Sequence, residues 1–211
     1  MRLLHGGDGS PFVRKVRIVL DEMGLPFERD TTLATDRPVE SFSKLNPTLK
    51  VPVLEDDGVV VFESNLIIEY LLRTYPIPEN QGDHSRLAPA LTRPDHHWED
   101  GKVLDTLRAM EDAAVFIRLL GVAGLASDSV PFLARQKARV SSCLDWLEAK
   151  VQSQAPEGFW PGHLSVADIS LVCALDFAAK HQIYTWQDRA SLKERVEQLY
   201  ERPSVSATRA P

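Results

Sequence analysis

Two short apolar runs with an acidic turn between them mark the first third of the chain. Val51–Leu54 and Val59–Phe62 are rich in β-branched residues, which favour β-strands. The intervening Asp56-Asp57-Gly58 supplies residues that tolerate a positive φ, as a tight hairpin requires. The pattern predicts two antiparallel strands, with Pro52 inside the first of them.

Apolar residues recur at helical spacing after two serines. One stretch follows Ser10-Pro11 and the other follows Glu63-Ser64. A serine at these positions suits the N-cap of a helix, because its hydroxyl can accept a hydrogen bond from a free backbone N–H. With strands expected at Leu3-Leu4 and Phe27–Leu33 and a helical turn at Ser41–Leu45, the order is β-α-β, helix, β-β-α. This order predicts a thioredoxin-like domain.

The second half of the chain is predicted to be helical. Between Pro76 and Pro94, prolines and a glycine break both periodicities, which predicts a linker over residues 77–94. The predicted domains are therefore 1–76 and 95–211. In the second domain, apolar residues form two stripes at helical spacing, Val103, Leu107, Met110, Ala114 and Ile117 in one and Val140, Leu144, Leu147 and Val151 in the other.

Composition and charge narrow the class of protein. The 211 residues are 44% hydrophobic and 26% charged, as in an ordinary globular protein, and a net charge of -6 without a basic tract argues against a nucleic-acid partner. No apolar run approaches the length of a membrane span, and the amino terminus lacks the apolar core of a signal peptide, so we expect a cytoplasmic protein with no membrane partner. Cys143 and Cys173 show no paired spacing and each lies within an apolar helical pattern, which predicts buried, inert thiols. The histidines lack metal-ligand spacing, which predicts no metal site.

Pro52 raises a question of backbone geometry. A proline within a strand lacks a ladder donor, so a trans bond on an edge strand is the ordinary explanation and the one that spacing alone favours. A cis Val51-Pro52 bond would instead turn the backbone of Val51 outward. The N–H and C=O of Val51 could then pair with an extended, peptide-like ligand.

Three polar residues each have a structural and a functional interpretation. The helix start at Ser64 exposes backbone N–H groups that favour a carboxylate, although a simple cap fits the residue better when it is taken alone. Ser10 lies at a strand-to-helix turn, where its hydroxyl either caps the helix, which is favoured without further context, or stabilises a bound thiolate. Lys50 either meets a ligand carboxylate or is a solvated surface lysine.

Three separated segments together resemble the cytosolic glutathione S-transferase superfamily, in its bacterial form with a serine-type active-site turn. They are Ser10-Pro11-Phe12-Val13-Arg14, Val51-Pro52-Val53-Leu54 with Glu63-Ser64, and Ser165-Val166-Ala167-Asp168, in that order. The last contains a Ser-x-x-Asp capping box, which we assign to folding. The resemblance implies an α/β plus all-α fold, a thioredoxin-like domain followed by an all-helical domain, and a cis-proline at Pro52. Leu49 departs from the family, which usually has glycine there.

The resemblance also implies a substrate and roles for the candidate residues. Glutathione would be the cosubstrate, with Ser10 donating a hydrogen bond to its sulfur and the backbone of Val51 pairing with its cysteinyl unit. Glu63 would bind the γ-glutamyl ammonium and Ser64 the carboxylate, with Lys50 and Pro52 beside them. The thiolate would attack a small hydrophobic electrophile in a pocket to which the helical domain contributes.

The resemblance also implies a quaternary structure. The resemblance implies a homodimer, and Asp95–Leu120 is the expected surface, because its stripe leaves Trp98, Phe116 and Leu119 to be covered. Taken singly, each of these side chains more often completes the core of its own subunit. Glu99, Asp100 or Asp105 would then be the acidic residue that reaches the γ-glutamyl ammonium across the interface.

Two other functions fit the same candidate site residues. One is a glutathione-binding, stress-associated interaction protein with little catalysis, and the other is a glutathione-dependent peroxidase or isomerase.

Overall fold

The computed structural model describes residues 1–79, 85–125, 130–154 and 158–209. The chain divides into two compact units, Met1–Leu91 together with Arg202–Pro211, and Thr92–Glu201. The last ten residues thus belong to the first unit, although the sequence places them in the predicted domain 95–211. The ranges 1–76, 77–94 and 95–211 stay a prediction about domains.

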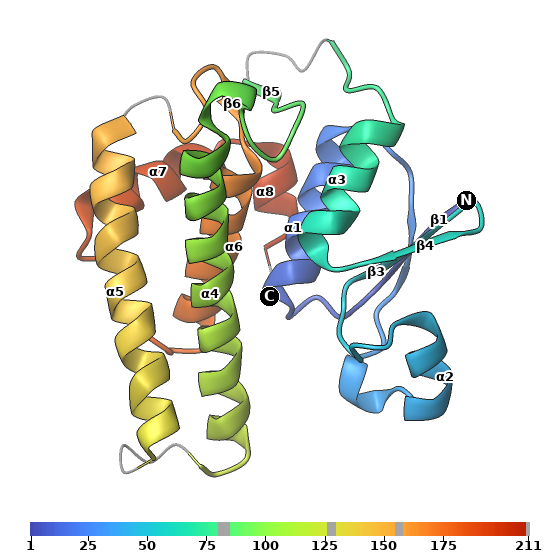
Figure 1. Ribbon diagram of the computed structural model, residues 1–211, viewed down its shortest axis with the longest axis horizontal. Helices are drawn as coiled ribbons and strands as arrows, with labels where there is room; N and C mark the ends of the chain where they lie inside the picture. Colours follow the sequence, from blue (N-terminus) through green and yellow to red (C-terminus); the bar gives the residue numbers. More distant parts are fainter. Residues whose placement is uncertain (80–84, 126–129, 155–157, 210–211) are drawn as a thin grey trace. The chain divides into compact units, whose positions relative to one another are not determined.

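The first unit is built on a mixed four-stranded sheet (Figure 1). Its strands are β1 (Arg2–His5), β2 (Glu28–Asp30), β3 (Val53–Asp56) and β4 (Val59–Phe62), in the order β2-β1-β3-β4. Strand β1 runs parallel to β2 and antiparallel to β3, and β3 and β4 form an antiparallel hairpin. This is the predicted thioredoxin-like topology, although β2 is shorter than the predicted strand Phe27–Leu33.

The hairpin confirms the prediction from the acidic turn. Asp57 and Gly58 both have positive φ angles, of 47° and 89°, as a two-residue turn between twisted strands requires. Pro52, in contrast, is not inside the strand, because β3 begins at Val53. A proline has no N–H to donate, so it fits just before the first ladder pair rather than within the ladder.

Helices lie on both sides of the sheet. Helix α1 (Pro11–Glu22) packs against α3 (Ser64–Thr74), while α2 (Val39–Leu45) lies on the other side (Figure 1). Helix α8 (Pro203–Ala207) packs against α1, and the short elements η1 (Ala34–Asp36) and β5 (Arg86–Leu87) complete the unit. The core between sheet and helices is fully buried and consists largely of Leu4, Val13, Val16, Leu54, Ile67, Ile68 and Leu71.

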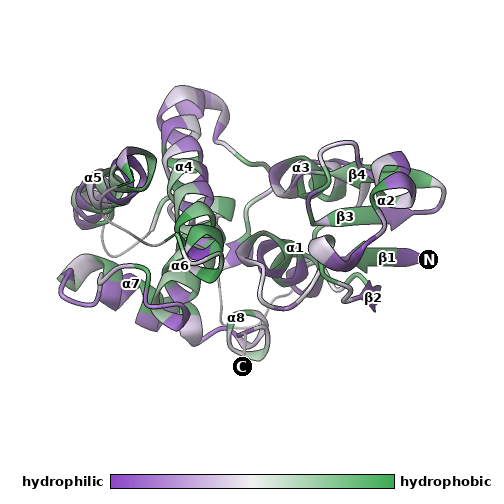
Figure 2. Ribbon diagram, turned by 90° about the horizontal axis from the view of Figure 1, so that it is seen from below, coloured by the Kyte–Doolittle hydropathy of each residue, from purple (hydrophilic) through white to green (hydrophobic). Residues whose placement is uncertain are grey.

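The second unit is almost entirely helical, as predicted. It comprises η2 (Pro94–His96), α4 (His97–Val122), α5 (Pro131–Gln154), β6 (His163–Leu164), α6 (Val166–Lys180) and α7 (Ala190–Tyr200). Helix α4 packs against α5 and α6, and α7 packs against α5 and α6. Of the two predicted stripes, every residue except Ile117 is buried. Helix α6 is hydrophobic around most of its circumference (green in Figure 2), as expected of a helix at the centre of a bundle.

The predicted capping box begins α6. The Ser165 hydroxyl accepts a hydrogen bond from the Asp168 backbone N–H at 3.1 Å, and the Asp168 carboxylate accepts from the Ser165 backbone N–H at 3.1 Å. Asp168 is fully buried, and its other oxygen accepts from the guanidinium of Arg195 in α7 at 2.9–3.0 Å. Gly158 makes room for this pair, because a Cβ there would lie 2.1 Å from Arg195. The box therefore joins two helices as well as capping one.

Candidate functional site

The strand register brings the predicted site residues of the first unit to one end of its sheet. His5, the last residue of β1, lies opposite Val53, and Val53 lies opposite Phe62, the last residue of β4. The segments that continue beyond these three positions are the turn to Ser10, Val51-Pro52 and Glu63-Ser64. Since neighbouring strands are about 5 Å apart, the register makes these three segments neighbours.

Ser10 is the N-cap of α1, with Pro11 at the first helical position. Its hydroxyl oxygen accepts a hydrogen bond from the backbone N–H of Val13 at 3.3 Å. A serine hydroxyl is also a donor, so the same group can cap the helix and still donate its hydrogen to an external acceptor. The two interpretations of Ser10 are thus compatible.

The Val51-Pro52 bond is cis, as the resemblance implies and in contrast to the trans bond that spacing alone favours. Val51 lies outside the ladder, and among the described residues neither its N–H nor its C=O has a hydrogen-bond partner. The Gly6 backbone packs against Val51 so closely that a Cβ on Gly6 would lie 3.0 Å from that of Val51. The first turn of the chain and the cis-proline segment are therefore in direct contact.

The loop before Val51 is organised by Asn46, which sequence reasoning missed. This buried side chain donates to the Lys50 carbonyl at 2.7 Å and accepts from the N–H of Thr48 at 2.9 Å. Leu49 has a φ of +55°, a conformation that favours glycine, which accounts for the glycine usual there in the resembling family. Lys50 is exposed beside Val51. The Asn-Pro pair after a helical segment was the available signal for this turn.

The start of α3 differs from the prediction. Ser64 is the first helical residue and not the N-cap, and Glu63 occupies the cap position without a side-chain capping bond. The Ser64 hydroxyl has no hydrogen-bond partner among the described residues, and the first N–H groups of a helix have none within it. Glu63 has a φ of 72° and a ψ of 122°, a strained conformation for a residue with a side chain. An exposed carboxylate, a hydroxyl and unpaired N–H groups therefore lie together.

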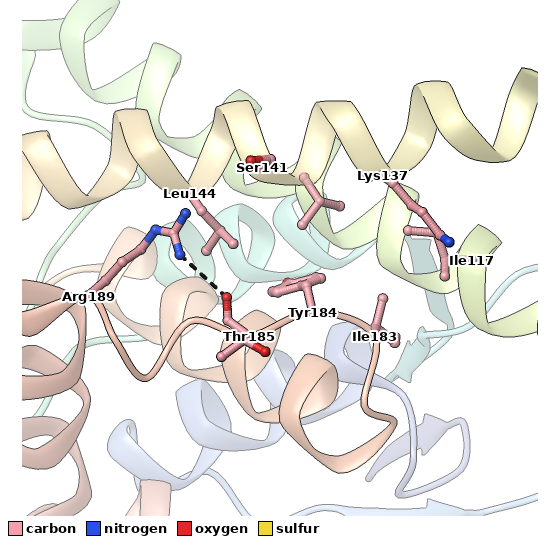
Figure 3. A pocket seen from close by; sticks show the side chains of 9 residues that line it. Ile117, Lys137, Ser141, Leu144, Ile183, Tyr184, Thr185 and Arg189 are labelled. Carbon is pink, nitrogen blue, oxygen red and sulfur yellow. Dashed lines mark hydrogen bonds between the residues drawn. The ribbon is translucent and has the colours of Figure 1, made fainter. Parts of the chain in front are cut away.

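The second unit contains a separate hollow of about 290 Å³ beside α5 (Figure 3). Lys137 and Arg189 lie towards its two ends, and Arg189 donates to the Thr185 carbonyl at 3.4 Å and to Asp145 at 2.7 Å. Burial, reinforced by the Glu111 charge, raises the pKa of Tyr184 on its wall. None of the predicted site residues lines this hollow.

The cysteines offer no reactive centre. Cys173 is buried, while Cys143 is only half-buried and not buried as predicted. Burial raises the pKa of the Cys143 thiol, which lowers its thiolate fraction and its reactivity.

In the parts of the chain that the structure describes, no three histidine, cysteine or acidic side chains gather as metal ligands. The described helices are also all too short or too polar to cross a membrane.

Comparison with known proteins identifies the family. A model of the glutathione S-transferase N-terminal domain matches residues 4–81. The uncharacterized GST-like protein YibF of Escherichia coli is 30% identical over 99% of this chain and 98% of its own, and glutathione S-transferase theta-3 of Mus musculus is 30% identical over 87% and 77%. A glutathione transferase family member from Pseudomonas fluorescens Pf-5, solved with bound glutathione, superposes with a TM-score of 0.77 at 25% identity over 100% of both chains. The chain belongs to the glutathione S-transferase superfamily.

Proposed function

We propose that the protein is a glutathione transferase that conjugates the glutathione thiolate to small hydrophobic electrophiles. The observation that carries the proposal is the meeting, at one end of the sheet, of three different binding groups. These are the Ser10 hydroxyl, the unpaired backbone of Val51 and the uncapped start of α3 at Glu63-Ser64. Each group matches one part of a γ-glutamyl tripeptide.

The sulfur is the part that Ser10 would bind. A thiol with a pKa near 8.5 is mostly protonated at neutral pH and is then a weak nucleophile. A hydrogen bond from the Ser10 hydroxyl stabilises the thiolate, and so does the positive end of the α1 dipole. Ser10 would thereby increase the fraction of glutathione that is ready to attack the electrophile.

The rest of the tripeptide would be held by the other two groups. The N–H and C=O of Val51 pair with the cysteinyl unit as an added strand does. The free N–H groups of α3 and the Ser64 hydroxyl bind the γ-glutamyl carboxylate, while Glu63 binds the ammonium. Pro52 sets the direction of the Val51 backbone, and Lys50 is near enough in sequence to meet a glutathione carboxylate. The pocket that the helical domain would contribute for the electrophile stays a prediction.

Calorimetric titration with glutathione, followed by steady-state assays with aryl halides, enones and an organic hydroperoxide, tests the proposal. We expect glutathione binding and turnover of at least one aryl halide or enone. Binding without turnover would favour the stress-associated interaction protein, and turnover of the hydroperoxide alone would favour a peroxidase. Absence of glutathione binding would refute the proposed function altogether.

Replacing Ser64 with alanine is expected to weaken glutathione binding by about ten- to a hundred-fold, the worth of one hydrogen bond to a charged group. Because Ser64 is not the N-cap of α3, we expect little change in thermal stability. Calorimetry measures the affinity. Ser41→Ala, which removes an exposed hydroxyl from α2, is the matched control and should bind as the wild type does. Equal affinity of Ser64→Ala and Ser41→Ala would place the γ-glutamyl site elsewhere.

We also propose a homodimer formed through the predicted surface of α4. Trp98 near the start of α4 and Phe116 and Leu119 near its end are 77%, 46% and 54% exposed in the single chain. Exposed apolar side chains at both ends of one helix would suit an extended interaction surface. Asp100 is held by Arg93 through its backbone and guanidinium, with the closest contact at 2.6 Å. Glu99 and Asp105 are therefore better placed to contact a second subunit.

Light scattering at micromolar concentration is expected to give a mass twice that of the 23.6 kDa chain. Trp98→Glu should shift this mass towards the monomer, because a charge then lies where an apolar contact forms. Val39→Glu, at an exposed valine of α2, is the control and should stay dimeric. A monomeric wild type would contradict the dimer without touching the proposed glutathione site.

A further inference from the structure

The turn between β1 and α1 has almost no side chains with which to hold its own shape. Gly6, Gly7 and Gly9 contribute none, so Asp8 is the one residue between His5 and Ser10 with a side chain beyond the backbone. Glycine has more backbone freedom to lose on folding than any other residue. A turn of this composition therefore depends on contacts from neighbouring elements.

Two arginines supply such contacts from the two elements that flank the turn. Arg17 in α1 and Arg29 in β2 both donate to the same Asp8 oxygen, Oδ1, at 2.7 and 2.8 Å. Arg29 donates through its other terminal nitrogen to the Gly6 carbonyl at 2.9 Å. Arg29 thus joins two points of the turn to each other and to the edge strand.

The two arginines of this arrangement lie in an environment that is unfavourable for an unpaired charge. Both arginines are largely buried, with side chains 18% and 20% exposed. Burial, followed by the neighbouring charge of Arg29, lowers the pKa of Arg17. Two cations this close repel each other, and the shared Asp8 carboxylate offsets that repulsion. The cluster is thus a three-residue unit with Asp8 at its centre.

We propose that Arg29 is a positioning residue for glutathione activation: it fixes the Gly6–Ser10 turn so that the Ser10 hydroxyl is directed at the sulfur, with Arg17 as the second support. The inference rests on the proposed function. The planar guanidinium reaches the Gly6 carbonyl and Asp8 at once, whereas the ammonium of a lysine acts as a single point charge. The role therefore depends on the shape of the side chain and not on its charge alone.

The test compares Arg29→Lys with the wild type, using the ultraviolet absorbance of the bound thiolate as a function of pH. We expect the midpoint of thiol ionisation to rise by about 0.5–1 pH unit as the Ser10 hydrogen bond is misdirected, and kcat at neutral pH to fall about five- to ten-fold. Glutathione affinity should stay within about three-fold, because the groups at Val51 and Ser64 that bind the rest of the tripeptide are unchanged. The thiol titration needs glutathione alone.

Arg37→Lys is the matched control. Arg37 is an arginine of the same unit whose side chain is 11% exposed, against 20% for Arg29. It donates to the Asp30 carboxylate at 2.9 Å, to the Thr32 carbonyl at 3.2 Å and to the Asp30 carbonyl, which also accepts from the Gly6 N–H, at 3.4 Å. No hydrogen bond or ion pair joins Arg37 to a described residue of the turn itself. We expect its thiol midpoint to equal that of the wild type. Equal shifts in Arg29→Lys and Arg37→Lys would show general loosening of the unit and overturn the proposal.

Arg29→Gln separates position from charge. If the midpoint of thiol ionisation in Arg29→Lys equals that of the wild type, the positioning role is overturned. If the midpoint is shifted in Arg29→Gln but not in Arg29→Lys, the cluster acts through its charge. Failure of the wild type to bind glutathione would refute the proposed function instead. An unshifted midpoint in Arg29→Lys with wild-type glutathione binding would refute the positioning role alone.

Discussion

Replacing Asp168 with alanine is expected to lower the free energy of unfolding of the helical unit by about 3–5 kcal/mol, the usual cost of removing one partner of a buried ion pair. Asp168 is fully buried and accepts hydrogen bonds from the backbone and hydroxyl of Ser165 and from the guanidinium of Arg195. Its loss removes the capping box and leaves a largely buried cation without its anion. Urea unfolding followed by tryptophan fluorescence measures the change.

Ser165→Ala is the reference variant with which the loss of unfolding free energy in Asp168→Ala is compared. It removes only the hydroxyl side of the capping box and should cost about 1 kcal/mol. Arg195→Leu removes the cation instead, and the double variant with Asp168→Ala should be less destabilised than the sum of the two single variants. Additive losses would mean that Asp168 and Arg195 do not stabilise each other. A loss below that of Ser165→Ala would reduce Asp168 to an ordinary cap residue.

Elements with a local signal could be predicted from the sequence. The hairpin followed from Asp57-Gly58, α1 from Ser10-Pro11 and α6 from Ser165 with Asp168, because each signal requires only nearby backbone geometry. The extent of β2 had no such signal, since a strand ends where its partner ends and β1 ends at His5. The start of α3 had no local signal either. Glu63 has a positive φ and takes the N-cap position, so the helix begins at Ser64, one residue earlier than predicted.

The site could be predicted only in part, for a related reason. Motifs named residues such as Val51 and Ser64 but not the contacts among the segments that carry them. The approach of Gly6 to Val51 joins positions 45 residues apart in the chain, and Arg29 reaches Asp8 across 21 residues. No periodicity links such positions, because sheet pairing brings them together. Asn46 is an intermediate case, since its turn is local but resembles many other Asn-Pro turns.

Replacing Ser10 with alanine is expected to raise the pKa of the bound glutathione thiol and to lower turnover at neutral pH about ten-fold or more, since one hydrogen bond to a charged group is worth about 1–3 kcal/mol. The change also removes the cap of α1, in which Ser10 accepts from the N–H of Val13. Two further variants separate these effects. Ser10→Thr keeps both cap and donor and should retain most of the activity. Ser10→Asp caps the helix as well as serine does, but its carboxylate cannot donate and repels a thiolate.

The order of activities expected in steady-state assays is therefore wild type, Ser10→Thr, Ser10→Ala and then Ser10→Asp. Thermal unfolding should rank the variants differently, with Ser10→Ala the least stable because it alone has no side-chain cap. Activity of Ser10→Asp below that of Ser10→Ala requires position 10 to lie beside the sulfur, because only there does the added carboxylate repel the thiolate. The loss of activity in Ser10→Ala relative to Ser10→Thr then measures the hydrogen bond from the hydroxyl. Activity that follows stability, with Ser10→Asp as active as the wild type, would reduce Ser10 to a helix cap and leave the thiolate to be stabilised by the α1 dipole alone.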